Sequence, residues 1–220
     1  MSTPAIGIDF GTTNSSVARI LPGGGVELAQ FPAVGGLTEA YRSLLYLELV
    51  EGGRTKTAKS WTGPAGIERY LAAETKGRLI QSLKSFLSSR TLVSTEVFGR
   101  RLRLETLIAC ILRDLRDGAS RQFQFEVKTA VVGRPVRFVG AETEEDNDFA
   151  EERLRESFLQ AGFDAVTFEL EPHGELVKLT VLHDHFEPDS IVAEMVSTGW
   201  PMVISSLKTL LETGETQPAS

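Results

Sequence analysis

The sequence contains little cysteine, no cluster of positive charge and no long apolar run. Its single cysteine, Cys110, cannot form an internal disulfide, which fits a reducing compartment. The net charge is −7 and the lysines and arginines form no block, so duplex nucleic acid is a poor partner, because phosphate binding depends on clustered cations. No apolar run is long enough to cross a bilayer, and the N-terminus lacks a secretory pattern. We therefore expect a soluble, cytoplasmic protein without a nucleic-acid or membrane partner.

The hydrophobic pattern indicates a folded α/β protein. The 220 residues are 41% hydrophobic, which excludes a disordered chain and suits one or two domains. Runs of apolar and β-branched residues between turn signals predict a series of strands. The predicted strands span residues 5–10, 15–20, 26–31, 43–50 and 125–133, with a short strand or ribbon at 96–103.

Helices are expected where apolar residues recur every three or four positions. The clearest spans residues 104–116, with Gly118 as its stop signal. A second is predicted at 149–161, after an acidic, solvated loop, and the segment 79–87 predicts a helix that carries Lys84. A long amphipathic helix, or two joined at a Gly-Trp-Pro sequence, is expected at 189–212.

The stretch "IGIDFGTTNSS" places a carboxylate, a glycine and several hydroxyl and amide groups between two apolar runs. Gly11 lets the backbone approach a ligand closely, and Thr12, Thr13 and Asn14 can donate hydrogen bonds to phosphate. Asp9 can orient water bound to a magnesium ion. The stretch is not a Walker loop, because it lacks the lysine spacing and joins strand to strand. The alternative is a polar β-turn that binds no ligand.

This stretch resembles the first phosphate motif of the actin-like ATPases, most closely the seventy-kilodalton heat-shock chaperones of DnaK type. The resemblance continues through "RSLLYLE", "SLKSFL", "TAVVGRPVRF" and "AGFDAVTFELEP", and it is closest to a divergent bacterial branch. It covers about residues 4–172. It implies a ribonuclease-H-like first lobe with a mixed sheet and helices, which binds ATP and magnesium.

The resemblance also implies roles for single residues. It points to Lys84 as the catalytic lysine, to Asp9 as a carboxylate that acts on magnesium through water, and to Glu171 as a further acidic site residue. Pro135 stands at the position of the family's proline, whereas Arg42 replaces another proline of the family pattern. Without the resemblance, Lys84 would be a solvated surface lysine and Glu171 a turn residue.

Residues from about 167 onward resemble a second family, the homologues of the activator of the ninety-kilodalton heat-shock ATPase, which have a helix-grip (START-like) fold. The matching residues are Leu179, Thr180, Val181, His183, Phe186, Gly199, Trp200, Pro201 and the run 206–214. The chain therefore resembles a composite of two families that meet at "VTFELEP". We expect an incomplete nucleotide-binding lobe at 1–166, followed at 167–220 by a β-hairpin and a long helix.

Two functions follow from these resemblances. The first is a DnaK-like chaperone-family protein with an ATP-phosphate-binding hairpin. Its nucleotide binding should be weak and its ATPase activity poor, because the glycine-rich phosphate turn of the family's second lobe does not occur in the 220 residues. The alternative is a non-enzymatic co-chaperone or interaction module that contacts other chaperones through the C-terminal hairpin and helix.

Two further expectations concern the C-terminal part. The apolar stripe from Trp200 to Leu211 must be buried, so we expect it to dock on the N-terminal sheet or to mediate self-association. His183 and His185, with His173, are candidate metal ligands, although zinc sites usually need three or four ligands in set geometry. The alternative is that these histidines are exposed at a strand end.

Overall fold

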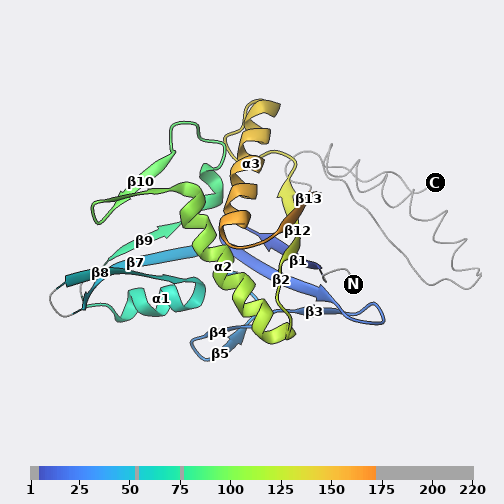
Figure 1. Ribbon diagram of the computed structural model, residues 1–220, viewed down its shortest axis with the longest axis horizontal. Coiled ribbons are helices and arrows are strands. Elements are labelled where there is room, and N and C mark those ends of the chain that lie inside the picture. The colour runs from blue at the N-terminus through green and yellow to red at the C-terminus, as the bar shows by residue number, and fades with distance from the viewer. Residues whose placement is uncertain (1–4, 53–54, 75–76, 172–220) are drawn as a thin grey trace, which may run out of the picture. The chain divides into compact units, whose positions relative to one another are not determined.

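The computed structural model describes residues 5–52, 55–74 and 77–171, and these lie in a unit that spans Met1–His173 (Figure 1). The described part is mixed α/β, as the sequence predicts. The second strand of the predicted hairpin, the helix with the Trp200 stripe and the three histidines lie outside the described residues. In the described part, every helix is too short or too polar to span a membrane.

The largest sheet has six strands in the order β13-β12-β1-β2-β3, and β6 also pairs with β2. Strands β1, β12 and β13 run parallel, whereas β2 is antiparallel to β1, β3 and β6. The strands are β1 (Ala5–Phe10), β2 (Asn14–Ile20), β3 (Val26–Leu28), β6 (Tyr41–Arg42), β12 (Thr129–Pro135) and β13 (Ala165–Glu171). Because β1 and β12 are parallel, their carboxyl ends lie at the same edge of the sheet.

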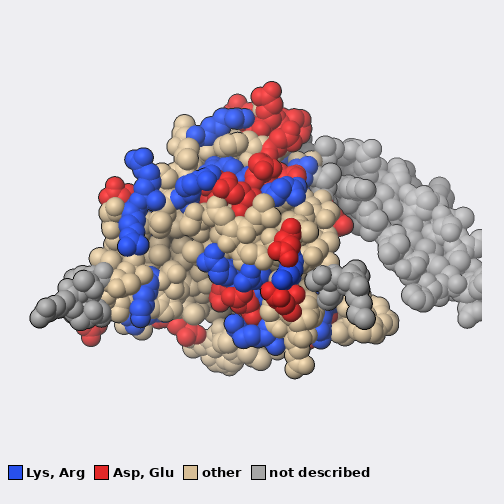
Figure 2. Space-filling view, viewed as in Figure 1, with Lys and Arg blue, Asp and Glu red and all other residues tan. Residues whose placement is uncertain are grey.

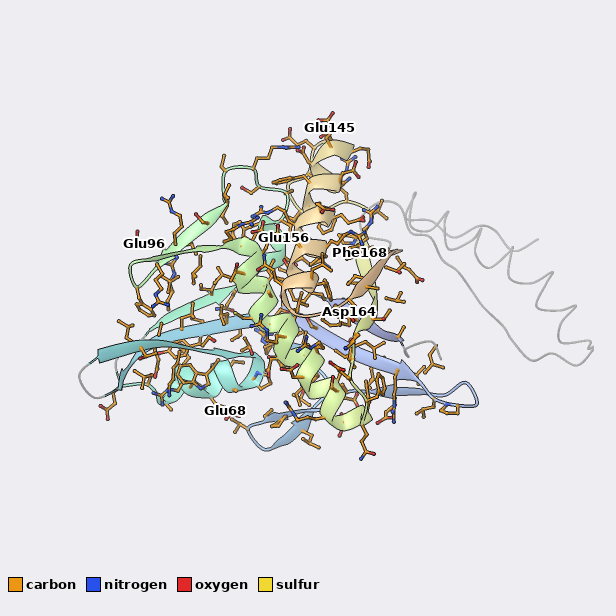
Figure 3. All side chains as sticks on the ribbon, in the orientation of Figure 1. Glu68, Glu96, Glu145, Glu156, Asp164 and Phe168 are labelled. Atoms are coloured by element: carbon orange, nitrogen blue, oxygen red, sulfur yellow. The ribbon has the colours of Figure 1, made fainter. Side chains whose placement is uncertain are left out.

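Helices α2 (Leu104–Phe123) and α3 (Glu144–Gln160) cover one face of this sheet (Figure 1). The side chains of β1 alternate, so that Ile6, Ile8 and Phe10 are buried while the residues between them are exposed. They share one buried cluster with apolar side chains of both helices, including Leu112 and Phe158. Figure 3 shows Phe168 of β13 beside α3, where its ring meets Phe158 edge to face at 6.3 Å. This packing holds the parallel strands in place.

A smaller antiparallel sheet is inserted between β6 and α2. Strand β7 (Leu44–Gly52) lies between β8 (Thr55–Thr62) and β9 (Arg78–Gln81), and α1 (Gly63–Ala72) follows β8. Two hairpins complete the described fold, β4 (Phe31–Ala33) with β5 (Gly36–Thr38), and β10 (Ser94–Val97) with β11 (Arg100–Arg103).

A partly buried polar contact joins β6 of the large sheet and β8 of the smaller sheet to α2. The Tyr41 hydroxyl donates to Asp114 Oδ2 at 2.5 Å, and the Thr62 hydroxyl donates to the same oxygen at 3.0 Å. Burial and the neighbouring carboxylate of Asp114 raise the pKa of Tyr41 far above its usual value. Tyr41 therefore stays a neutral donor.

Several predicted elements are wrong in type or in bounds. The segment 79–87 is not an α-helix, because its first part pairs with β7 as β9 and the rest forms a short 3₁₀ helix, η1 (Leu83–Phe86). Gly118 does not end α2, which continues to Phe123. The ring of Phe31 packs where a side chain of residue 118 would lie, which gives a glycine a packing role inside the helix. The predicted strand 26–31 is two strands, β3 and β4.

Helix α3 begins earlier than predicted, within the acidic run that the sequence suggested was a loop. Thr143 is its N-cap, with its hydroxyl accepting from the Asp146 amide at 3.2 Å while the Asp146 carboxylate accepts from the Thr143 amide at 3.2 Å. The hydrogen bonds from Thr143 hold the pKa of Asp146 below its usual range. Acidic residues in a first turn also suit the positive end of the helix dipole, so this run starts the helix.

Candidate functional site

A pocket of about 420 Å³ lies at the carboxyl edge of β1 and β12. Three segments that are far apart in the sequence line it: the β1–β2 turn, the 3₁₀ helix η1 and the loop after β12. The lining residues are Asp9, Gly11, Thr12, Thr13, Lys84, Pro135, Arg137, Phe138 and Val139. The structure therefore brings together five of the seven residues that the sequence analysis predicted for a phosphate site.

The β1–β2 turn is tightly closed. A Cβ on Gly11 would overlap the carbonyl oxygen of Asn14, so only glycine fits this turn without movement. The carbonyl of Thr13 accepts from the Ser43 amide at 2.9 Å, and the Ser43 hydroxyl lies 2.8 Å from that of Ser15 in a buried contact. These contacts fix the position of the turn at the pocket edge.

Two predicted site residues are not among the lining residues. Asn14 is exposed, and its Oδ1 accepts from Arg42 Nη1 at 3.2 Å. Glu171 is the last residue of β13 and pairs with Pro135 in the sheet register, which places its backbone at the same edge as the pocket. The predicted roles of both residues stay predictions.

Lys84 lies on η1 and is only 8% exposed. The neighbouring side chains of Leu83 and Leu87 are buried in the core cluster, and they hold η1 against the rest of the fold. Ser82, just before η1, adopts a left-handed backbone conformation with φ 57°, which turns the chain from β9 into η1. Lys84 is thus held at the pocket by packed structure rather than on a free surface.

The opposite wall begins at Pro135, the last residue of β12, and continues through the loop that follows. The Asn147 side chain of α3 accepts from the Phe138 amide at 2.9 Å, and the Ser88 hydroxyl donates to the Val139 carbonyl at 2.6 Å. Sequence analysis missed Arg137, Phe138 and Val139. The only sequence signal for them was their position shortly after Pro135 in "RPVRFV".

The pocket combines donors and cations with one carboxylate. Lys84 and the exposed Arg137 supply positive charge, and the hydroxyls of Thr12 and Thr13 can donate to an anion. On the face shown in Figure 2, by contrast, the described basic and acidic side chains are interspersed over α2 and α3. The basic and hydroxyl side chains of this pocket therefore suit an anion, beside an apolar wall formed by Pro135, Phe138 and Val139.

Magnesium fits this pocket as a partner of phosphate. Mg²⁺ is usually held by one or two carboxylates together with substrate phosphates and water. Asp9 supplies one such carboxylate, and the described residues contain no cluster of three or more His, Cys, Asp or Glu that could hold a metal ion by themselves. The donor set thus suits a metal that arrives with a phosphate ligand.

The family model for activator of Hsp90 ATPase homolog 1-like proteins matches residues 112–212, slightly less than half of the chain. The match supports the resemblance predicted for the C-terminal part, but it begins much earlier than residue 167. It takes in the end of α2, then β12, α3 and β13, with β12 and β13 parallel to each other. The β1–β2 turn and Lys84 lie outside the matched residues. The match therefore favours the non-enzymatic alternative over the ATPase interpretation.

Proposed function

We propose that the pocket between the β1–β2 turn and Lys84 binds the phosphates of a nucleotide such as ATP, together with magnesium. One observation carries the proposal. Polar turn residues and a lysine about seventy positions further along the chain line a single pocket. A plain β-turn would not need a largely buried lysine beside it. The DnaK-type resemblance implied a mixed sheet with helices, and a mixed sheet with helices is also what the proposal needs.

Each side chain has a distinct part in this proposal. Thr12 and Thr13 donate hydrogen bonds to phosphate oxygens, while Lys84 and Arg137 offset the phosphate charge from the other side. Asp9 orients water on the magnesium ion. Hydrogen bonds that involve a charged group contribute more than neutral ones, so these few contacts can hold a phosphate even at an open site.

We expect weak nucleotide binding and little turnover from this pocket. Asp9, Thr13, Arg137 and Val139 are exposed, so water reaches the ligand. Phosphoryl transfer needs charge stabilisation in a site from which water is excluded. The described pocket supplies donors for phosphate but does not enclose it.

Replacing Thr12 and Thr13 together with alanine should weaken ATP binding at least about tenfold, equivalent to about 1.4 kcal/mol, because two phosphate donors are lost. Isothermal titration of the full chain with ATP and magnesium measures this. The matched control replaces Thr57 of β8 and Thr167 of β13, both exposed and outside the pocket, and should bind like the wild type. Equal affinities for all three proteins would refute the proposal.

We also propose a second function, a non-enzymatic module that acts on an Hsp90-type chaperone. The match of residues 112–212 to activator of Hsp90 ATPase homolog 1-like proteins carries this proposal. It needs neither nucleotide binding nor the β1–β2 turn, so the two functions can be tested separately.

The full chain should raise the ATPase rate of a purified Hsp90 in a dose-dependent way. Trp200→Ala, within the matched residues, should reduce this stimulation by more than half. Ile20→Ala is the control, because Ile20 is a strongly exposed apolar side chain outside the match. Steady-state phosphate release measures the rate, and circular dichroism checks that both variants fold. No stimulation by the wild type at any concentration would exclude this function.

A further inference from the structure

We propose that Arg153 of α3 is a positioning residue that holds Lys84 at the pocket. The inference rests on the proposed phosphate-binding function, and it assigns a part to a side chain that does not line the pocket. Arg153 is only 5% exposed, an unusual place for a guanidinium. Its hydrogen-bond partners show what it does there.

The guanidinium of Arg153 donates to the backbone just after Lys84. Nη1 lies 3.3 Å from the carbonyl oxygen of Phe86, 3.1 Å from that of Leu87 and 3.0 Å from that of Ser89, and Nη2 lies 3.0 Å from that of Leu92. The Phe86 carbonyl also accepts from the Ser89 amide at 3.1 Å, so Arg153 is a second donor there. In the turn that follows η1, Arg153 supplies donors to the carbonyls of Leu87, Ser89 and Leu92.

A buried carboxylate keeps this guanidinium in place. Glu105, in the first turn of α2 and 1% exposed, accepts from Arg153 Nε at 2.5 Å. The second Glu105 oxygen lies 3.2 Å from Arg103 Nε, in an orientation that makes no hydrogen bond. One planar group thus links α2, α3 and the turn that carries Lys84. A lysine could not replace it, because a single ammonium cannot span Glu105 and several carbonyls at once.

The hydrogen bonds that Arg153 donates to these carbonyls also fix the position of Lys84. The Leu87 amide donates to the carbonyl oxygen of Lys84 at 3.3 Å, so the two residues belong to the same turn. Ser88 lies in the segment whose carbonyls accept from Arg153, and its hydroxyl donates to the Val139 carbonyl on the opposite wall of the pocket. If Arg153 no longer held these carbonyls, they would rotate toward water, and Lys84 and the link between the two walls would shift together.

Arg153→Lys in the full chain tests this inference. ATP and magnesium affinity should fall about tenfold, and the same change should cost almost nothing further in a Lys84→Met background, because coupled residues do not act additively. Arg155→Lys is the matched control. Arg155 lies on the same helix but donates to Val166 and Glu151 rather than to the η1 turn. A loss of the same size in the Lys84→Met background would overturn the inference.

A second measurement needs no nucleotide, so it separates this inference from the proposed function. Acetylation of each lysine in the folded chain is followed by mass spectrometry. Lys84, only 8% exposed, should react slowly in the wild type and in Arg155→Lys, and several-fold faster in Arg153→Lys, whereas the exposed Lys59 should not change. Unchanged reactivity of Lys84 would overturn the positioning role. Absent ATP binding with faster acetylation would refute only the proposed function.

Discussion

Glu105→Ala is expected to lower the free energy of unfolding by about 3–5 kcal/mol, because it leaves the buried Arg153 charge without its carboxylate. The pair is almost fully enclosed, so water cannot replace the lost partner. The carbonyls that Arg153 contacts would then be its only polar partners among the described contacts. Urea unfolding followed by circular dichroism measures the change.

Glu156→Ala is the matched control for this prediction. Glu156, which is labelled on α3 in Figure 3, also pairs with an arginine, Arg103, at 2.9 Å, but its side chain is 36% exposed. Exposed pairs of this kind contribute about 0–1 kcal/mol. Equal losses in the two variants would show that Glu105 does not neutralise a buried charge.

A double variant separates the contribution of the Glu105–Arg153 ion pair to stability from that of the hydrogen bonds that Arg153 donates to backbone carbonyls. Replacing both partners of a buried pair with apolar residues is often tolerated, because no lone charge remains. Here Glu105→Met with Arg153→Met should still be clearly less stable than the wild type, because the carbonyls after η1 lose their donors as well. Full recovery in the double variant would mean that the carbonyl contacts contribute little.

The elements that form the β1–β2 turn could be predicted from the sequence because local signals agree there. The apolar residues Ile6, Ile8 and Phe10 at every second position, a second apolar run at 15–20 and turn residues between them all favour two strands joined by a turn. The start of α2 was equally clear from its apolar repeat. These are segments whose own residues determine both their type and the face they bury.

The errors occurred where a tertiary contact decides the structure. Gly118 has the composition of a helix stop, but its missing side chain makes room for the Phe31 ring, a contact from a distant hairpin. The apolar spacing around Lys84 imitates a helix, yet pairing of β9 with β7 takes its first half into a sheet. The acidic run before residue 149 is the exception, because the Thr143–Asp146 capping box that begins the helix there is a local contact and its spacing is visible in the sequence.

The candidate site shows the same division. Asp9, Gly11, Thr12 and Thr13 lie together in the sequence, so their proximity could be inferred directly. Lys84 could be assigned to the same site only through a family resemblance, since nothing local distinguishes it from a surface lysine. Arg153 carried no signal at all, because its partners come from two other segments and are mostly backbone atoms. A sequence pattern shows which side chains recur and at what spacing. Every residue offers the same main-chain carbonyl, so an arginine that donates to carbonyls leaves no such pattern.

Gly11→Ala is expected to disrupt the pocket more than any change to a lining side chain. The added methyl would overlap the backbone oxygen of Asn14, and a backbone atom cannot rotate away as a side chain can. The β1–β2 turn must therefore open, which should cost about 1–3 kcal/mol of stability. Opening also displaces Thr12 and Thr13, so ATP and magnesium affinity should fall by more than about tenfold, beyond the stability cost alone.

Gly7→Ala provides the control on the same strand. A Cβ at Gly7 meets only the Ala18 oxygen, at 4.0 Å, so the methyl fits and stability should change by less than about 0.5 kcal/mol. Thermal unfolding and isothermal titration of both variants test the pair of predictions together. If Gly11→Ala matched Gly7→Ala in stability and in nucleotide affinity, the turn would tolerate a side chain, and a tight backbone approach to phosphate would not be needed. If stability fell but nucleotide affinity did not, the turn would have a structural role only, and the pocket beside it would have another function.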